Sequence, residues 1–191
     1  MAYQKVSVPK NGDGAGCAAA KSSEIIIIDA EDIVSEPTRT VGNVVMEGDY
    51  TLKEDAESVS IYATAPTIDY TEEYSGDPDA RGVKQGIGYE HPGNSVAIKN
   101  HTEAYMNKGV VILNKECDGS ADGRVQAFGS KCNPLYMTPE TTNNKEACKR
   151  KFVWKQEQAS KFLPGDYKGK MPKIAAEAAE PTPPDQVTEG A

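Results

Sequence analysis

The sequence predicts a mainly β protein, a single β-sandwich or barrel-like domain with one short helix, long loops and extended termini. Apolar and polar residues alternate repeatedly through the middle of the chain, which is typical of half-buried strands. Turn-forming residues, including 17 glycines and 12 prolines, separate these short segments. Helix-like patterns are few. Many short strands divided by turns favour a sandwich or a barrel.

The clearest alternation lies between residues 58 and 74. In residues 58–64 the apolar Val59, Ile61 and Ala63 alternate with polar side chains, so we expect a strand with one apolar face. Residues 67–74 place aromatic and apolar side chains on one face and mainly acidic and hydroxyl side chains on the other. One side of this sheet is therefore expected to meet water.

Further segments rich in β-branched or aromatic residues are predicted to be strands because turn residues bound most of them. Two of them, residues 25–28 and 110–113, are apolar on both faces. Such strands either lie centrally in the core or meet another subunit on their second face. The full set comprises residues 24–29, 41–47, 95–99, 109–113, 124–128, 135–137 and 151–157.

One short helix is predicted at residues 144–150, where asparagine resembles an N-cap and cations stand at the end. Two long stretches rich in Gly, Pro and Asp, residues 75–94 and 117–134, are expected to be loops or arms with a function. Residues 74–79 are interpreted as an exposed loop or the tip of a projecting hairpin. We expect the subunit to fold when a short linker replaces residues 75–94.

A chain of 191 residues fits one domain with flexible ends. The predicted division is an N-terminal arm at residues 1–23, a β-rich domain at 24–172, and an acidic, proline-containing tail at 173–191. The tail lacks large apolar residues. Truncation at Met171 is therefore expected to leave the domain folded.

Composition limits the classes of function. The formal charge of −8 and the pI near 4.9 argue against a phosphate-binding surface, although an acidic surface suits a passage through which DNA slides without sticking. Hydrophobic residues make up 38% of the chain, so part of the stability is expected from neighbouring subunits. The longest apolar cluster, residues 25–28, is too short to cross a membrane, and we expect neither a membrane span nor an export signal.

Four cysteines, Cys17, Cys117, Cys132 and Cys148, show neither a metal-binding pair nor a disulfide framework. A cytoplasmic product keeps such thiols reduced. Cys117 and Cys132 flank a turn-rich segment and would face each other if that segment were a hairpin, so a bridge between these two stays open.

Motifs for catalysis and metal binding are weak. His91 and His101 each stand in a polar stretch without a second ligand at metal spacing. Residues 118–123 match the start of a calcium loop, but Gly129 occupies the position of the bidentate glutamate, which favours a turn. Nucleophile and nucleotide-binding signatures are absent from the sequence. We therefore predict no catalytic, cofactor-binding or metal-binding residues, and a protein that is not an enzyme.

Two groups of charged residues resemble functional sites, but an ordinary structural role explains each of them. A basic run with interleaved aromatic residues resembles a patch for single-stranded nucleic acid, but alternation predicts that Phe152 and Trp154 share a buried face while the lysines share the other. The cations are Lys149, Arg150, Lys151 and Lys155. Pairs of carboxylates suited in principle to glycoside hydrolysis are interpreted as solvated faces: Glu72 with Glu73, Asp77 with Asp79, and Glu54 with Asp55.

Segments spread over about residues 24–170 resemble tail-tube (major tail) proteins of tailed bacteriophages, from phages or prophages of gut bacteria. The segments that carry the resemblance are residues 24–32, 42–48, 60–64, 109–113, 129–135, 152–156 and 165–169. The resemblance implies a β-sandwich with one flanking helix, hexameric rings that stack through a long loop or hairpin and terminal arms, and inner sheets joined around an often acidic lumen. The glycine-rich residues 11–20 have no counterpart in that plan.

The partners implied by the resemblance are copies of the chain itself, other tail or virion proteins, and phage DNA that passes without specific binding. The implied location is the virion tail, assembled in the host cytoplasm, and residues 75–94 are assigned to contacts between rings. A capsid decoration or head-to-tail connector protein is the alternative. A carbohydrate-binding module using Tyr70, Tyr74 and Tyr89 ranks lower because the only tryptophan, Trp154, is predicted to be buried, and a small hydrolase ranks last.

Overall fold

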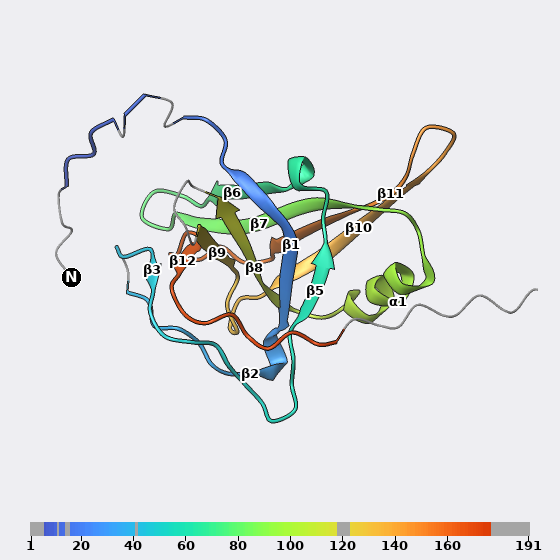
Figure 1. The fold of residues 1–191 in the computed structure, drawn as a ribbon. Coiled ribbons are helices and arrows are strands. Elements are labelled where there is room, and N and C mark those ends of the chain that lie inside the picture. Colours follow the sequence, from blue (N-terminus) through green and yellow to red (C-terminus); the bar gives the residue numbers. More distant parts are fainter. Residues whose placement is uncertain (1–5, 11, 14–15, 41, 118–122, 177–191) are drawn as a thin grey trace, which may run out of the picture.

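The computed structural model describes residues 6–176 except 11, 14–15, 41 and 118–122, and it has a mainly β fold with mixed strand pairing (Figure 1). The helical elements of this part are α1 (Val96–Tyr105) and two short 3₁₀ turns, η1 (Ala30–Asp32) and η2 (Ala65–Thr67). The strands are β1 (Ala20–Asp29), β2 (Ile33–Ser35), β3 (Val45–Met46), β4 (Thr51–Leu52), β5 (Val59–Tyr62), β6 (Asp69–Ser75), β7 (Gly82–Pro92), β8 (Val110–Cys117), β9 (Arg124–Phe128), β10 (Leu135–Asn143), β11 (Cys148–Gln156) and β12 (Gly165–Tyr167).

The large sheet folds back on itself into a barrel-like sandwich. Its strand order is β3-β12-β9-β8-β10-β11-β7-β6. β1 pairs with β8 along the edge opposite β9, and it also pairs with β5. β10 meets β8 through the single pair Leu135 and Val110. Where β5 ends, the N–H of Thr64 donates to the carbonyl of Glu90 at 2.9 Å and connects to the end of β7. Strands β1, β5, β7, β11, β10 and β8 thus surround a common interior.

The main core fills this interior. Alternating residues of each strand point inward, as the period of two predicted, and the largest side chains that are fully buried include Trp154, Tyr89, Phe128 and Phe152. α1 closes part of the core by contributing Ile98 and Tyr105. Each large apolar side chain buried here stabilises the fold by about 1.5–3 kcal/mol.

A second core covers the opposite face of β1 and β8. Ile26 and Ile28 of β1 pack with Val111 and Leu113 of β8. The chain covers them with residues of its own, Ile33, Met46, Tyr50, Ala127 and Tyr167. The two strands that are apolar on both faces therefore lie centrally within one subunit. Their composition gives no reason to invoke a neighbouring subunit.

The helix lies elsewhere than predicted. Residues 95–99, predicted to be a strand, begin α1, because the Ser95 hydroxyl accepts from the N–H of Ile98 at 3.4 Å and caps the helix. Residues 144–150, predicted to be a helix, form the turn between β10 and β11 and the start of β11. The Asn144 side chain accepts from the N–H groups of Glu146 and Ala147 at 2.9 and 3.0 Å. The same asparagine chemistry that caps helices here closes a hairpin.

The prediction that residues 75–94 form a loop was also wrong. They contain β7, a strand between β6 and β11 whose inward side chains include Val83 and Ile87. The glycines that indicated a loop allow close strand packing, because a Cβ on Gly86 would collide with the Thr71 hydroxyl and the Trp154 carbonyl. Only the tip of the predicted loop is a turn. A linker in place of residues 75–94 would remove a strand from the core.

The C-terminal boundary of the ordered domain extends past Lys173. The N–H and hydroxyl of Ser58, a fully buried residue, donate to the Lys173 carbonyl at 2.8 and 2.9 Å. The N–H of Ala175 donates to the Ser58 carbonyl at 2.8 Å, and Lys173 forms an ion pair with Glu57. The first residues of the predicted tail therefore attach to the domain beside β5.

Candidate functional site

A four-stranded antiparallel section of the sheet, β6-β7-β11-β10, ends in two strands with a free edge. β6 pairs with β7 through all seven of its residues. β10 pairs with β11 through all nine of its residues and meets β8 only at Leu135. Within the described part of the chain, no backbone hydrogen bond forms on the outer side of β6, or on that of β10 beyond Leu135. Unpaired edges of this length are templates for another chain.

The directions of the two free strands are complementary. Because each strand of the section runs antiparallel to its neighbour, β6 and β10 run in opposite directions. A copy related by rotation about an axis along the strands therefore presents its β10 antiparallel to β6. Pro139 lies in β10, as expected of an edge strand, and removes one N–H donor from it. The antiparallel ladder can continue from copy to copy with that one interruption.

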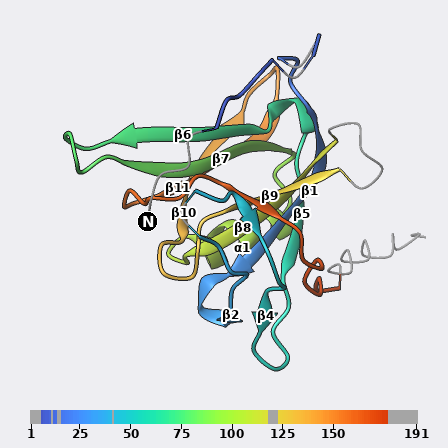
Figure 2. The ribbon, with the colours of Figure 1, turned by 90° about the vertical axis from the view of Figure 1, so that its left-hand side faces the viewer.

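The β6–β7 hairpin projects from the body of the molecule (Figure 2). Its turn is closed by a bond from the N–H of Ala80 to the carbonyl of Asp77 at 3.0 Å, and Gly76 has a φ of 109° that favours glycine. Near the tip, Tyr74 is 66% exposed and its hydroxyl donates to Glu72 at 2.8 Å. This exposed ring on a projecting hairpin is suited to contact with another molecule.

The outer face of the four-stranded section is polar and balanced in charge. Lys149 forms an ion pair with Glu90 at 2.8 Å, and Lys155 approaches Glu73 at 3.8 Å. Gly86 and Gly88 leave the centre of β7 without side chains on this face. The strand registers place eight charged side chains on it: Lys84, Lys149, Lys151, Lys155, Asp69, Glu73, Glu90 and Glu140.

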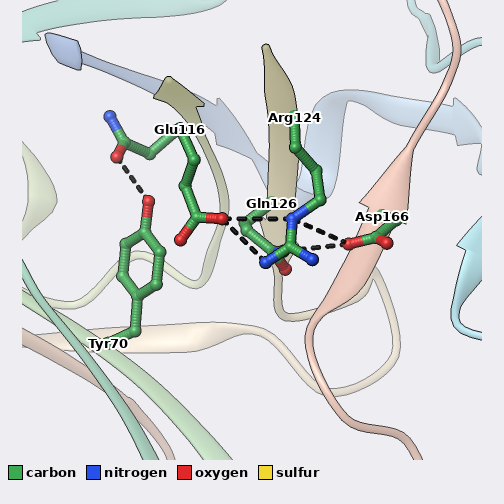
Figure 3. A network of polar contacts seen from close by, with 6 residues as sticks. Tyr70, Glu116, Arg124, Gln126 and Asp166 are labelled. Atoms are coloured by element: carbon green, nitrogen blue, oxygen red, sulfur yellow. Dashed lines mark hydrogen bonds and ion pairs between the residues drawn. The ribbon is translucent and has the colours of Figure 1, made fainter. Parts of the chain in front are cut away.

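A polar network ties the opposite face of β6 to the other half of the sandwich (Figure 3). The Tyr70 hydroxyl donates to the Asn114 side chain at 2.6 Å, and burial together with Glu116 raises the pKa of Tyr70. Arg124 donates to Glu116 at 2.8 and 3.1 Å and lies 3.6 Å from Asp166. The two carboxylates are held by one guanidinium, so the network serves first as a structural connection between β6, β8, β9 and β12.

One small pocket borders the network and another lies beside Arg39, and both are lined by groups that already have partners. One, of about 250 Å³, lies beside Tyr70, Phe128 and Asp166. The other, of about 240 Å³, includes Arg39 and Gln85. Arg39 lies over the Phe162 ring at 5.2 Å and donates to the Leu163 carbonyl, and Gln85 donates to the Phe162 carbonyl at 2.8 Å. Neither pocket gathers an array of groups suited to proton transfer or nucleophilic attack.

The basic run around β11 has the alternation predicted for it. Phe152 and Trp154 are fully buried, and the indole N–H of Trp154 donates to the Tyr89 hydroxyl at 3.1 Å. Lys151 and Lys155 lie on the exposed face. Rings buried in this way cannot stack on bases, so the run lacks the aromatic half of a single-strand binding site.

The other residues weighed for binding do not come together. Of the three tyrosines weighed for a sugar platform, Tyr89 is 1% exposed and Tyr70 is half-buried, so only Tyr74 presents an exposed ring. The carboxylate pairs lie apart, at Glu54–Asp55 beyond β4, at the hairpin tip, and on β6. His91 contacts the Tyr62 carbonyl and His101 packs on Tyr105. Among the described residues, no three His, Cys, Asp or Glu side chains form a group that could hold a metal ion.

The candidate calcium loop and the cysteine pair can be placed only in part. Residues 118–122 lie outside the described residues.

All four cysteines are free and exposed. In the β8–β9 hairpin Glu116 pairs with Arg124 and Ile112 with Phe128, so Cys132 lies beyond the far end of the ladder from Cys117. That offset is roughly 16 Å along a strand, too far for a disulfide between Cys117 and Cys132.

No family model matches the chain, and neither the curated proteins nor the solved structures contain a match. Within the described residues, no helix is both long enough and apolar enough to cross a membrane.

The free edge of β10 escaped prediction because only residues 135–137 were predicted to be a strand. The alternation of Tyr136, Thr138 and Glu140 with Met137 and Pro139 was the available signal, since proline favours edge strands.

Proposed function

We propose that the chain is a structural, non-enzymatic subunit that assembles with copies of itself into stacked rings, as a tail-tube protein of a tailed bacteriophage. The observation that carries the proposal is the four-stranded section whose two long free edges, β6 and β10, run in opposite directions. The resemblance of residues 24–170 to tail-tube proteins supports the same function.

Lateral assembly follows from pairing β6 of one copy with β10 of the next. This contact is head-to-tail, and its repetition by a rotation that closes gives a ring. Each copy gains a partner for both free edges, which removes the surfaces that otherwise invite uncontrolled aggregation. The polar outer face of the section then lines the lumen. Its balanced charge, with Lys149 and Lys155 beside carboxylates, lets DNA pass without a specific grip.

Stacking of rings is assigned to the projecting tip of the β6–β7 hairpin, residues 74–81. The larger segment 75–94 cannot serve as a whole because β7 belongs to the core. In this proposal the partners are further copies of the chain and other tail or virion proteins, and the assembled subunits belong to the virion tail after assembly in the host cytoplasm.

Crosslinking between β6 and β10 tests the lateral contact. Thr71→Cys and Thr138→Cys are combined in a chain whose four natural cysteines are replaced by serine; both threonines lie on the outer face. A bifunctional thiol reagent with a flexible spacer, which tolerates shifts in register, should yield a ladder of oligomers ending at one closed species. Each single-cysteine variant is the matched control and should yield no ladder.

Three results distinguish the possible outcomes. Dimers from Thr71→Cys alone would indicate symmetric pairing of β6 with β6, and no crosslinked species at any protein concentration would reject the lateral contact. A closed ladder accompanied by rings that never stack would favour the alternative, a head-to-tail connector or decoration protein.

A further inference from the structure

A histidine lies where α1 packs on the main core. The imidazole of His101 stacks on the Tyr105 ring at a centroid distance of 4.7 Å and meets the Phe152 ring edge-on at 6.0 Å. Its Nε2 is buried and has no hydrogen-bond partner among the described residues. A neutral imidazole is tolerated in such a place, whereas an imidazolium would lose its hydration without gaining an acceptor.

We propose that protonation of His101 releases α1 from the main core, so that the docking of this helix on the barrel is sensitive to acid. This device is independent of ring assembly. α1 has ten residues, fewer than an isolated helix needs to persist in water, so release also melts it. The contacts that open include those of the buried Ile98 and Tyr105.

The charged groups around His101 offer little compensation for a positive charge. Asp29, at the end of β1, is the facing carboxylate; its Oδ2 forms a 2.6 Å ion pair with Lys108, and its buried Oδ1 has no hydrogen-bond partner among the described residues. His91, on β7, carries a positive charge itself once protonated and opposes that of His101. Burial, reinforced by His91 and opposed by Asp29, lowers the pKa of His101 to about 4.

Arg150 of β11 places a permanent cation under the same helix. It is 9% exposed, and its guanidinium donates to the hydroxyl of Thr102 at 2.6 Å and to the side chain of Asn94 at 2.9 Å. These bonds hold α1 while His101 is neutral. They cannot neutralise an imidazolium, because guanidinium offers donors and no acceptor.

The sign of the pH dependence follows from the two protonation states. His101 in a released helix has the ordinary pKa near 6.5, and in the docked helix the pKa is about 4. Docking is therefore fully favoured above about pH 6.5 and weakens as the pH falls toward 4. Across that window the released fraction should rise by up to about tenfold per pH unit.

Trp154 reports docking directly. It is the only tryptophan in the chain, fully buried, and its ring meets that of Tyr105 at 6.2 Å. We expect its emission to shift to longer wavelength, and its quenching by acrylamide to increase, as the pH falls from about 7 to about 4. The protein must be dilute and its light scattering followed, because the pI near 4.9 lies within this range and favours association.

Variants decide whether His101 is responsible. His101→Phe and His101→Gln should each abolish the shift, and His91→Gln, the matched control, should retain it; the glutamine variant serves if phenylalanine does not fit. The proposal fails if the parent emission is constant over the range, if both His101 variants shift like the parent, or if His91→Gln alone removes the shift. Loss of the strand signal in circular dichroism at the same pH would also overturn it, because that result is global unfolding.

Discussion

The indole N–H of Trp154 donates to the hydroxyl of Tyr89 at 3.1 Å in the middle of the main core. Both side chains are essentially unexposed, and they lie on the neighbouring strands β11 and β7. Burial raises the pKa of Tyr89, so its hydroxyl stays neutral over the ordinary range of pH. The two strands that form the centre of the four-stranded section are thus joined by a polar contact in an apolar surrounding.

Tyr89→Phe is expected to lower the free energy of unfolding by about 1–3 kcal/mol, because the buried indole donor of Trp154 loses its acceptor. Chemical denaturation measures the loss. Tyr74→Phe removes an exposed hydroxyl from the neighbouring strand β6 and is the control, with no measurable change expected. Equal stability of the Tyr89→Phe variant and the parent would show that the contact is dispensable.

Gly86→Ala should destabilise the subunit by about 1–3 kcal/mol, because the new Cβ collides with the Thr71 hydroxyl and the Trp154 carbonyl. Gly88→Ala is the matched control, since its Cβ meets nothing closer than the Phe152 carbonyl at 3.7 Å. Thermal unfolding of both variants checks the prediction. Equal shifts in Tm for the two would contradict close packing at Gly86.

Tyr74→Ala should weaken stacking while leaving the fold intact, because this exposed ring lies on the part of the hairpin assigned to contacts between rings. Tyr62→Ala is the control, since Tyr62 is comparably exposed on β5, away from the hairpin. Electron microscopy of assembled material compares tube lengths. Tubes of parental length from Tyr74→Ala would remove Tyr74 from the stacking contact.

Truncation tests the residues of the C-terminal segment that attach to the domain beside β5. Deleting residues 177–191 should leave the free energy of unfolding unchanged. Deleting residues 172–191 should lower it by about 1–3 kcal/mol, because the buried backbone N–H of Ser58 loses the Lys173 carbonyl. Denaturation of the two truncated chains makes the comparison. Equal stability of the shorter chain and the parent would restore the expectation that everything after Met171 is dispensable.

The period of two was enough to predict most of the long strands. β1, β5, β6, β9 and β11 fall within or around predicted segments because their sequences alternate apolar with polar residues or contain an apolar run. The two-sided burial of residues 25–28 and 110–113 was likewise predicted, but whether the second face meets the core or another subunit was left open; the structure places it in the core. What covers the second face was not, since Met46, Tyr50 and Tyr167 are distant in sequence.

The errors arose where a local signal has two structural uses. Gly82, Gly86 and Gly88 indicate a loop by composition, but they lie in β7, where Gly86 permits close contact with β6 and β11. Asn144 resembles a helix cap and closes a hairpin instead. Pairing between β6 and β7 decides the first case and pairing between β10 and β11 the second. Local propensity does not contain such pairing between strands.

Electron microscopy of the purified protein, with sedimentation over a range of concentrations, tests the central claim most directly. The account predicts closed rings that stack into tubes, with density continuous from β6 of one subunit to β10 of the next. A stable monomer at high concentration, unchanged by nucleating tail components, would contradict it. So would a symmetric dimer joined through β6 alone.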